Sequence, residues 1–350
     1  MSSATETPPH GLPLSVTATH GQTVLDLSGK QLSTLPESIG TLRALEALDV
    51  DENQLVSLPE SLGQLTNLTI LTVYNNQLMA LPACLRQLTR LTAFSVGRNH
   101  LTALPESLWQ LTNLQTLNVA ENHVSSLSEG LGNLTQLQML DLGHNALTCL
   151  PESLGNLRRL RFLYLSHNQL TTLPTSFEHL GHLLYLSLTD NHLTSLPDSL
   201  GNLTRLIELR LYNNRLSTLT ASLGHLTHLK ELHVMHNALV SLPVSLGNLS
   251  NLKKFSVQGN RLTALPTSLG NLTSLTDLDV RNNQLTSLPE SLGQLRHLRS
   301  LDLRGNKLVT LPASLGALPH LEKLDVRWNK LPALPAWMHQ LEQRGCTVYT

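Results

Sequence analysis

Leucine or another apolar residue recurs at fixed positions of a 23-residue unit along this chain, and polar residues fill most of the positions between. In the unit Leu275–His297 the apolar residues stand at positions 1, 4, 6, 11, 14, 18 and 21, with Asn at position 9 and Pro at position 15. Position 9 is Asn in thirteen units without insertion or deletion, from Asn53 to Asn329, and an earlier unit has Lys30 there. A fixed period of this length predicts a solenoid of stacked repeats.

Each unit divides into two halves with different periodicity. Positions 3 to 7 alternate as a short strand does, which directs positions 4 and 6 into the core and positions 3, 5 and 7 outward. The second half begins with Pro and continues with leucines three apart, which favours an extended turn followed by 3-10 or short α-helical structure. We therefore predict an α/β solenoid of about fourteen repeats, with a parallel concave sheet and short 3-10 turns on the convex side.

The recurring Asn lies where the chain leaves the strand. Its amide can donate to and accept from backbone groups of neighbouring turns that no sheet reaches. We expect a buried ladder of these side chains along the solenoid.

The ends of the chain depart from the repeat. We predict that residues 1–20 form a disordered start and the first arm of an N-terminal cap hairpin, and that residues 21–334 form the solenoid. Residues 335–350 are expected to form a C-terminal cap, in which a helix over Pro335–Arg344 ends at Gly345 and a last strand follows. The sequence contains no obvious further domain.

The repeat resembles that of the leucine-rich-repeat family, whose LxxLxLxxNxL core matches the segment from Leu137 to Leu147. The resemblance covers roughly residues 22 to 342. The 23-residue length and the LPxxLGxLxxL second half are similar to those of bacterial repeat proteins and of the intracellular Ras-associated group. The resemblance implies a fold and a binding surface, and it does not by itself name a function.

Composition narrows the cellular setting. The formal net charge is −1, so no global field favours nucleic acid or an anionic membrane as a partner. The three cysteines Cys84, Cys149 and Cys346 form no paired caps, which indicates a reducing compartment. No classical signal peptide precedes the repeats. We predict a monomer in the cytoplasm, with export into a host cell by a dedicated secretion system as the alternative.

Sequence motifs give little support for catalysis. No P-loop, GxSxG, HExxH or CxxC motif occurs. His144, His167 and Asp190 fall at position 8 of three successive units and could present ligands toward one metal, but a row of solvated or partner-contacting histidines explains them equally well. We predict a non-enzymatic protein without a cofactor or metal, and keep an enzyme or metal site in the central histidine row as an unlikely alternative.

Aromatic residues are concentrated in the middle of the predicted concave face. Of the twelve Phe, Trp and Tyr residues in the chain, Phe162, Tyr164, Tyr185 and Tyr212 occupy outward positions of three adjacent units. Exposed apolar groups with a polar rim are typical of protein-binding hot spots. The predicted partner site comprises Met139, Phe162, Tyr164, Tyr185, Ile207, Arg210, Tyr212, His233, Met235 and His236. Stacking of the aromatic rings on one another along the sheet is the alternative.

Two other surfaces have alternative interpretations. The Asp–Arg pairs at positions 5 and 7 of the last units, such as Asp302 with Arg304, are expected to screen one another at the surface. Trp109 replaces a Gly and is expected to project from the convex face, either lying over the next segment or offering a second contact site. The function we predict is binding of a partner protein on the concave face. The alternatives are a bacterial effector that engages host signalling or ubiquitin-pathway proteins, and an intracellular scaffold.

Overall fold

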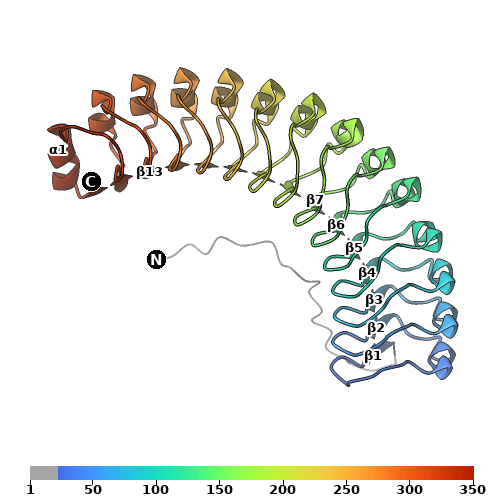
Figure 1. The fold of residues 1–350 in the computed structure, drawn as a ribbon. Helices are drawn as coiled ribbons and strands as arrows, with labels where there is room; N and C mark the ends of the chain where they lie inside the picture. The colour runs from blue at the N-terminus through green and yellow to red at the C-terminus, as the bar shows by residue number, and fades with distance from the viewer. Residues whose placement is uncertain (1–22) are drawn as a thin grey trace.

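The structure is a computed structural model that describes residues 23–350. Fifteen short parallel strands follow one another in chain order in a single curved sheet, which lines the inner side of an open arc (Figure 1). The strands are β1 (Val24–Asp26), β2 (Ala47–Asp49), β3 (Ile70–Thr72), β4 (Ala93–Ser95), β5 (Thr116–Asn118), β6 (Met139–Asp141), β7 (Phe162–Tyr164), β8 (Tyr185–Ser187), β9 (Glu208–Arg210), β10 (Glu231–His233), β11 (Lys254–Ser256), β12 (Asp277–Asp279), β13 (Ser300–Asp302), β14 (Lys323–Asp325) and β15 (Thr347–Tyr349). This architecture confirms the predicted solenoid with its parallel concave sheet.

Short 3-10 helices alternate with the strands and form the outer rim of the arc (Figure 1). They are η1 (Glu37–Thr41), η2 (Glu60–Gln64), η3 (Ala83–Gln87), η4 (Glu106–Gln110), η5 (Glu129–Asn133), η6 (Glu152–Asn156), η7 (Thr175–His179), η8 (Asp198–Asn202), η9 (Ala221–His225), η10 (Val244–Asn248), η11 (Thr267–Asn271), η12 (Glu290–Gln294) and η13 (Ala313–Ala317). One α-helix, α1 (Trp337–Gln343), comes before the last strand. The predicted disordered start and hairpin arm, residues 1–20, lie outside the described residues.

The residue at position 15 lies directly before each 3-10 helix and is its N-cap. Proline holds it extended in most units, as at Pro151 with φ −69° and ψ 148°. Where Ser128 and Thr220 replace the proline, their side chains accept hydrogen bonds from the backbone N–H groups of Gly130 and Ser222. In these two units a hydrogen bond from the helix to the hydroxyl oxygen stabilises the start of the 3-10 helix, where in other units the proline ring fixes φ.

The Asn at position 9 ties successive units together. Asn168 Nδ2 donates to the Leu142 carbonyl of the preceding unit at 2.9 Å, and its Oδ1 accepts from the Leu147 N–H at 3.0 Å. The same pair of bonds recurs at all thirteen Asn positions, for example at Asn53 and Asn329. The predicted ladder of buried amides is present along the length of the solenoid.

Position 8, just before this Asn, adopts the left-handed conformation in every unit from Glu52 to Trp328. The φ angles lie near +55°, as at His144 (+53°) and Asn213 (+55°), and glycine takes this place at Gly259 and Gly305. Gly and Asn tolerate this region best among the residues found here. The departure of the chain from the strand at this point was predicted, but the left-handed conformation of position 8 was not.

The convex side is packed so closely that position 19 of most units must be glycine. A Cβ added to Gly201 would lie 2.4 Å from the carbonyl oxygen of Ser222 in the next unit. Trp109 replaces this glycine, and the expectation that it projects outward is wrong, since the residue is only 2% exposed. Its indole lies against Gly130, the residue that stands where the next unit elsewhere has serine. The loss of one side chain makes room for the other.

The last elements lie within the range predicted for the C-terminal cap. Met338 and Leu341 of α1 are buried, Gly345 follows with φ +91°, and β15 pairs in parallel with β14. Together these residues pack against the leucine core of the last repeat.

Candidate functional site

One row of side chains crosses the concave sheet at position 3 of the repeat. In-register pairing places Met139 beside Phe162 and Phe162 beside Tyr185. The row continues through Glu208 on β9 to Glu231 on β10. An apolar stretch on β6 to β8 therefore changes to an acidic stretch at the next two strands.

A second row runs parallel to the first at position 5. Tyr164 on β7 is beside Ser187 on β8, and Ser187 is beside Arg210 on β9. Arg210 is in turn beside His233 on β10. The structure thus brings most of the predicted site residues onto five adjacent strands. The aromatic residues lie on β7 and β8, and the charged residues lie on the next two strands, β9 and β10.

Tyr164 and Tyr185 are less exposed than we expected from their outward positions. Each is only 7% exposed, and their ring centroids are 5.0 Å apart with the planes tilted by 40°. The guanidinium of Arg210 lies 5.5 Å from the Tyr185 ring centroid. Burial raises the pKa of both phenols. These two tyrosines pack against each other along the sheet, as the alternative interpretation expected.

The remaining apolar residues of the predicted site retain access to solvent. Ile207, which precedes β9, is 36% exposed. Partly exposed side chains surround the tyrosine pair, and these are Met139, Phe162, Tyr212 and Met235. We refer to the five residues Met139, Phe162, Ile207, Tyr212 and Met235 as the concave patch. His236 lies beyond it, exposed on a position-8 turn with φ +52°.

The charged side of the site is a paired network. Arg210 Nε donates to Glu208 Oε1, and Glu231 contacts both His233 Nε2 at 3.1 Å and Lys254 Nζ at 3.0 Å. The hydrogen bond from His233 and the charge of Lys254 lower the pKa of Glu231 to about 2, in spite of its partial burial. Glu231 therefore enters any binding event as an ionised group, and both carboxylates are already partnered.

One group of possible metal ligands lies within the charged network. Among residues 23–350, the group of three whose ligand atoms lie within 4.8 Å of one another is Glu208, Glu231 and His233. Arg210 and Lys254 already neutralise its carboxylates. A metal ion at this point would have to displace both cations.

The histidine row that we considered as an alternative metal site has a different arrangement. The rings of His144 and His167 stack with centroids 4.0 Å apart, and His167 Nε2 lies 3.2 Å from Asp190 Oδ2. Asn213 Nδ2 donates to the other oxygen of Asp190 at 2.7 Å. The contacts form a stack of rings followed by hydrogen bonds along the turns, which is a surface arrangement that needs no ion.

The Asp–Arg pairs of the last units are more buried than the expected surface network. Asp302 is 8% exposed and Asp325 is fully buried. Arg304 bridges the two carboxylates, at 2.5 Å from Asp302 and 3.3 Å from Asp325, and Arg327 lies 2.7 Å from Asp325. Burial raises the pKa of Asp325, but hydrogen bonds from Arg327 outweigh it and the pKa is lowered. These pairs are part of the packing between units.

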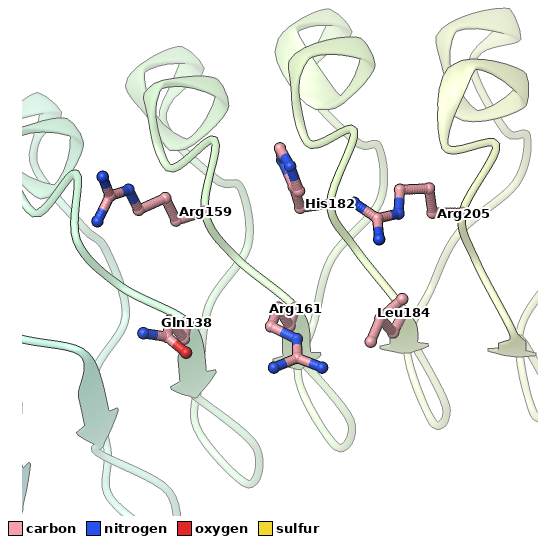
Figure 2. Close-up of a pocket in the computed structure, with 6 residues that line it drawn as sticks. All are labelled: Gln138, Arg159, Arg161, His182, Leu184 and Arg205. Carbon is pink, nitrogen blue, oxygen red and sulfur yellow. The ribbon is translucent and has the colours of Figure 1, made fainter.

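A basic side face was not singled out by sequence reasoning. Positions 22, 23 and 2 of successive units lie together where the chain runs from the convex rim back to the sheet. An open pocket of about 250 Å³ on this face is lined by Gln138, Arg159, Arg161, His182, Leu184 and Arg205. Figure 2 shows Arg159, His182 and Arg205 in one row and the other three in a second row at the start of the strands. A tally of charge by repeat position, rather than along the chain, would have found it.

Comparisons with known proteins agree with this architecture. Models described as "Leucine-rich repeat region" match residues 23–129 and 124–241, and a "Leucine rich repeat" model matches overlapping stretches from 227 to 331. A leucine-rich-repeat protein of Leptospira interrogans is 32% identical with a TM-score of 0.72, over 93% of this chain and 95% of that one. No curated protein matches the chain.

Two further solved structures are similar. An internalin of Listeria monocytogenes is 26% identical with a TM-score of 0.76, over 89% of this chain and 88% of that one. A plant peptide hormone receptor, RGFR1, solved in complex with RGF2, is 30% identical with a TM-score of 0.82, and the match covers 93% of this chain and 54% of the receptor chain. Among the described residues, no helix has the length and apolar character to cross a membrane.

Proposed function

The chain belongs to the leucine-rich-repeat family, and on this premise we propose that it binds a partner protein through the concave patch. Proteins with this fold commonly mediate protein–protein interaction. The observation that carries the proposal is the set of partly exposed apolar side chains on the strand face, at positions that the repeat does not need for its core. Apolar and aromatic groups of this kind dominate the energy of many interfaces.

The surroundings of the concave patch suit an interface. Tyr164 and Tyr185 pack against each other as a tilted, nearly buried pair on the same strand face, so these two side chains have little conformational freedom left to lose on binding. Arg210 and Glu208 provide paired charges at one side, which favours a partner with complementary polar groups. The binding of RGF2 by the similar plant receptor supports a polypeptide partner.

We propose further that the protein acts by presentation of this rigid surface and not by chemistry. Bacterial proteins among the similar structures, from Leptospira and Listeria, support the more specific version in which a bacterial protein engages a host protein. A scaffold that works inside the producing cell is the competing version. Capture experiments in the two kinds of lysate distinguish them.

The test is capture of a partner on the purified protein from animal-cell lysate and, separately, from bacterial lysate, followed by mass spectrometry and measurement of affinity. The variant combines Ile207→Ala, Tyr212→Ala and Met235→Ala. Each truncation of an interface anchor costs about 1 to 2 kcal/mol or more, so we expect affinity to fall by at least about tenfold. Because these side chains keep access to solvent, the melting temperature should change by only a few degrees.

A matched control changes apolar residues that are exposed away from the sheet. Met79, Val240 and Val244 are 73%, 52% and 70% exposed, and their replacement by Ala removes comparable apolar surface. We expect this control to bind as the parent does. Equal binding by the concave variant and the parent would contradict the proposal.

A further inference from the structure

The basic side face has an excess of unpaired positive charge. Six exposed cations occupy positions 22, 23 and 2 of neighbouring units, namely Arg158, Arg159, Arg161, Arg205, Lys230 and Lys253. At these three positions no Asp or Glu occurs in the units from Thr66 to His320. Within residues 23–350, none of the six lies within 4.0 Å of a carboxylate. The overall charge of −1 shows that this excess is local.

The acidic residues at the adjoining position 3 do not compensate for it. Glu208 is bound by Arg210, and Glu231 by His233 and Lys254. Both carboxylates belong to the concave network. Arg159 donates to the neutral Gln136 side chain, and the Arg161 guanidinium lies 5.8 Å from the Phe162 ring centroid. Neither contact neutralises the charge, so the side face can still receive an anion from outside.

The pocket residues show how such an anion would be held. Arg159, Arg161 and Arg205 line one open pocket, with two of them on the row nearest the convex rim and one at the start of β7 (Figure 2). Guanidinium groups bind carboxylates through two parallel N–H donors, which gives geometric selectivity as well as charge. His182 donates from Nδ1, as its 2.9 Å contact with the Arg158 carbonyl requires, and so leaves Nε2 for the ligand.

Apolar side chains lie within the same face. Leu184 lines the pocket beside Arg161, and Ile207 occupies position 2 of the next unit, followed by Lys230. No Phe, Trp or Tyr stands at positions 22, 23 or 2 in these units, so the stacking platform typical of single-stranded nucleic-acid sites is missing from the face. Leu184 is only partly exposed, unlike a side chain that inserts into a lipid surface.

We propose that the basic side face is a second binding surface, which takes an acidic polypeptide segment. Carboxylates of the segment pair with Arg159, Arg161 and Arg205. Its apolar side chains contact Leu184 and Ile207. This surface adjoins the concave patch through Ile207, but it can be occupied whether or not the concave patch is.

The test uses the full-length protein and defined probes. A short fluorescent peptide rich in Glu with central leucines is titrated against it, alongside the same peptide with Gln for every Glu, a poly(dT) oligonucleotide and vesicles containing phosphatidylserine. The variant combines Arg159→Gln, Arg161→Gln and Arg205→Gln. We expect the Glu peptide to bind the parent and to lose affinity by on the order of tenfold or more in the variant, with weaker binding at high salt.

A charge-matched control separates this face from net charge. Arg86, Arg215 and Arg261 are also exposed, form no ion pair among the described residues, and stand at positions 19 and 10 of their units, away from positions 22, 23 and 2. Their replacement by Gln removes the same number of charges. The control should bind the Glu peptide as the parent does.

The proposal is overturned if the Glu peptide does not bind, if the Gln peptide binds as well, or if both variants lose equal affinity. Tighter binding of the oligonucleotide or the vesicles than of the peptide would assign the face to another class of partner and would also overturn it. The variant that tests the concave patch keeps all three arginines. Failure of the side-face proposal therefore leaves the proposal for the concave patch standing.

Discussion

Trp109 fills the space that a side chain on Gly130 would need. A Cβ added at Gly130 would lie 2.3 Å from Trp109 Cδ1, and the indole is almost fully buried by this contact and its neighbours. Elsewhere on the convex side the arrangement is reversed. Gly201 and Gly247 stand against serines of the next unit, at Ser222 and Ser268. The pair of Trp109 and Gly130 therefore fills in reverse the gap that glycine and serine fill in other units.

The exchange of these two residues predicts a coupled stability effect. Gly130→Ser should overpack the contact at a cost of about 1 to 3 kcal/mol, and Trp109→Gly should leave a cavity. The double variant restores the pair seen at Gly201 and Ser222, so its destabilisation should be smaller than the sum of the two by about 1 kcal/mol or more. Urea denaturation of all four proteins measures the coupling. Simple additivity would show that the two side chains do not compete for the same space.

The inward strand positions predict a large and local core effect. Leu186 lies in β8 at position 4 of its repeat unit and is fully buried. Its replacement by Ala should lower the free energy of unfolding by roughly 2 to 5 kcal/mol. Leu184, two residues earlier, is partly exposed, and Leu184→Ala should cost much less. Denaturant melts that show equal losses for the two variants would contradict the register of this strand.

The amide ladder predicts a loss from a side chain that makes no apolar contact of its own. Asn168→Ala would leave the Leu147 N–H without its acceptor and the Leu142 carbonyl with only the longer hydrogen bond from Asn145 Nδ2, at a cost of roughly 1 to 3 kcal/mol. Asn168→Asp should also destabilise, because a carboxylate cannot donate to the carbonyl. Asn202 is exposed on η8, and Asn202→Ala serves as the control. A melting temperature unchanged by Asn168→Ala would show that water replaces the amide.

The repeat architecture could be predicted because successive units have apolar residues and Asn at the same positions. Apolar residues at positions 4 and 6 are buried in every unit from Leu48 to Val326, and Asn at position 9 makes the same two hydrogen bonds from Asn53 to Asn329. Local periodicity and packing between units therefore agree, and one unit suffices to predict its neighbours.

The features that the sequence did not predict depend on side chains 20 or more residues apart. Gly130 allows Trp109 to be buried, and Tyr185 covers much of Tyr164. The repeat gives the position of each residue but not the tilt of its ring. The basic side face escaped notice because its charges come from the end of one unit and the start of the next, so they are dispersed along the chain.

Cysteine reactivity follows from burial. Cys84 is 5% exposed and Cys346 is also buried, whereas Cys149 is exposed. Burial raises the pKa of the Cys84 thiol to about 11, which further suppresses the reactive thiolate. An alkylating reagent at neutral pH should therefore label Cys149 first, as peptide mass spectrometry would show. The Cys149→Ser variant should lose this rapid labelling. Rapid labelling of Cys84 in the folded protein would contradict its placement.

Asp51 predicts a dependence of stability on pH. Burial raises the pKa of this carboxyl to about 6, although the Tyr74 N–H donates to it. Between about pH 4 and pH 6 the folded protein then binds more protons than the unfolded chain, so the free energy of unfolding falls as pH rises through this window and stays lower above it. Asp51→Asn keeps an acceptor oxygen for Tyr74 and removes the buried charge. We expect it to stabilise the protein by roughly 1 kcal/mol at pH 7, a figure reduced for the partial exposure of the group, and to have little effect below pH 4.

Glu231 provides a comparison of opposite sign. The hydrogen bond from His233 lowers its pKa to about 2, so its contribution to stability is present above about pH 4.5 and is lost as pH falls toward 2. Glu231→Gln should therefore destabilise the protein at pH 7 and have progressively less effect in acid. Thermal melts of both variants and the parent, recorded from pH 3 to pH 7, measure the two slopes. If Asp51→Asn and Glu231→Gln changed the melting temperature in the same direction at pH 7, the two carboxylates would not differ as the structure requires, since one is ionised against burial and the other is held ionised by its partners.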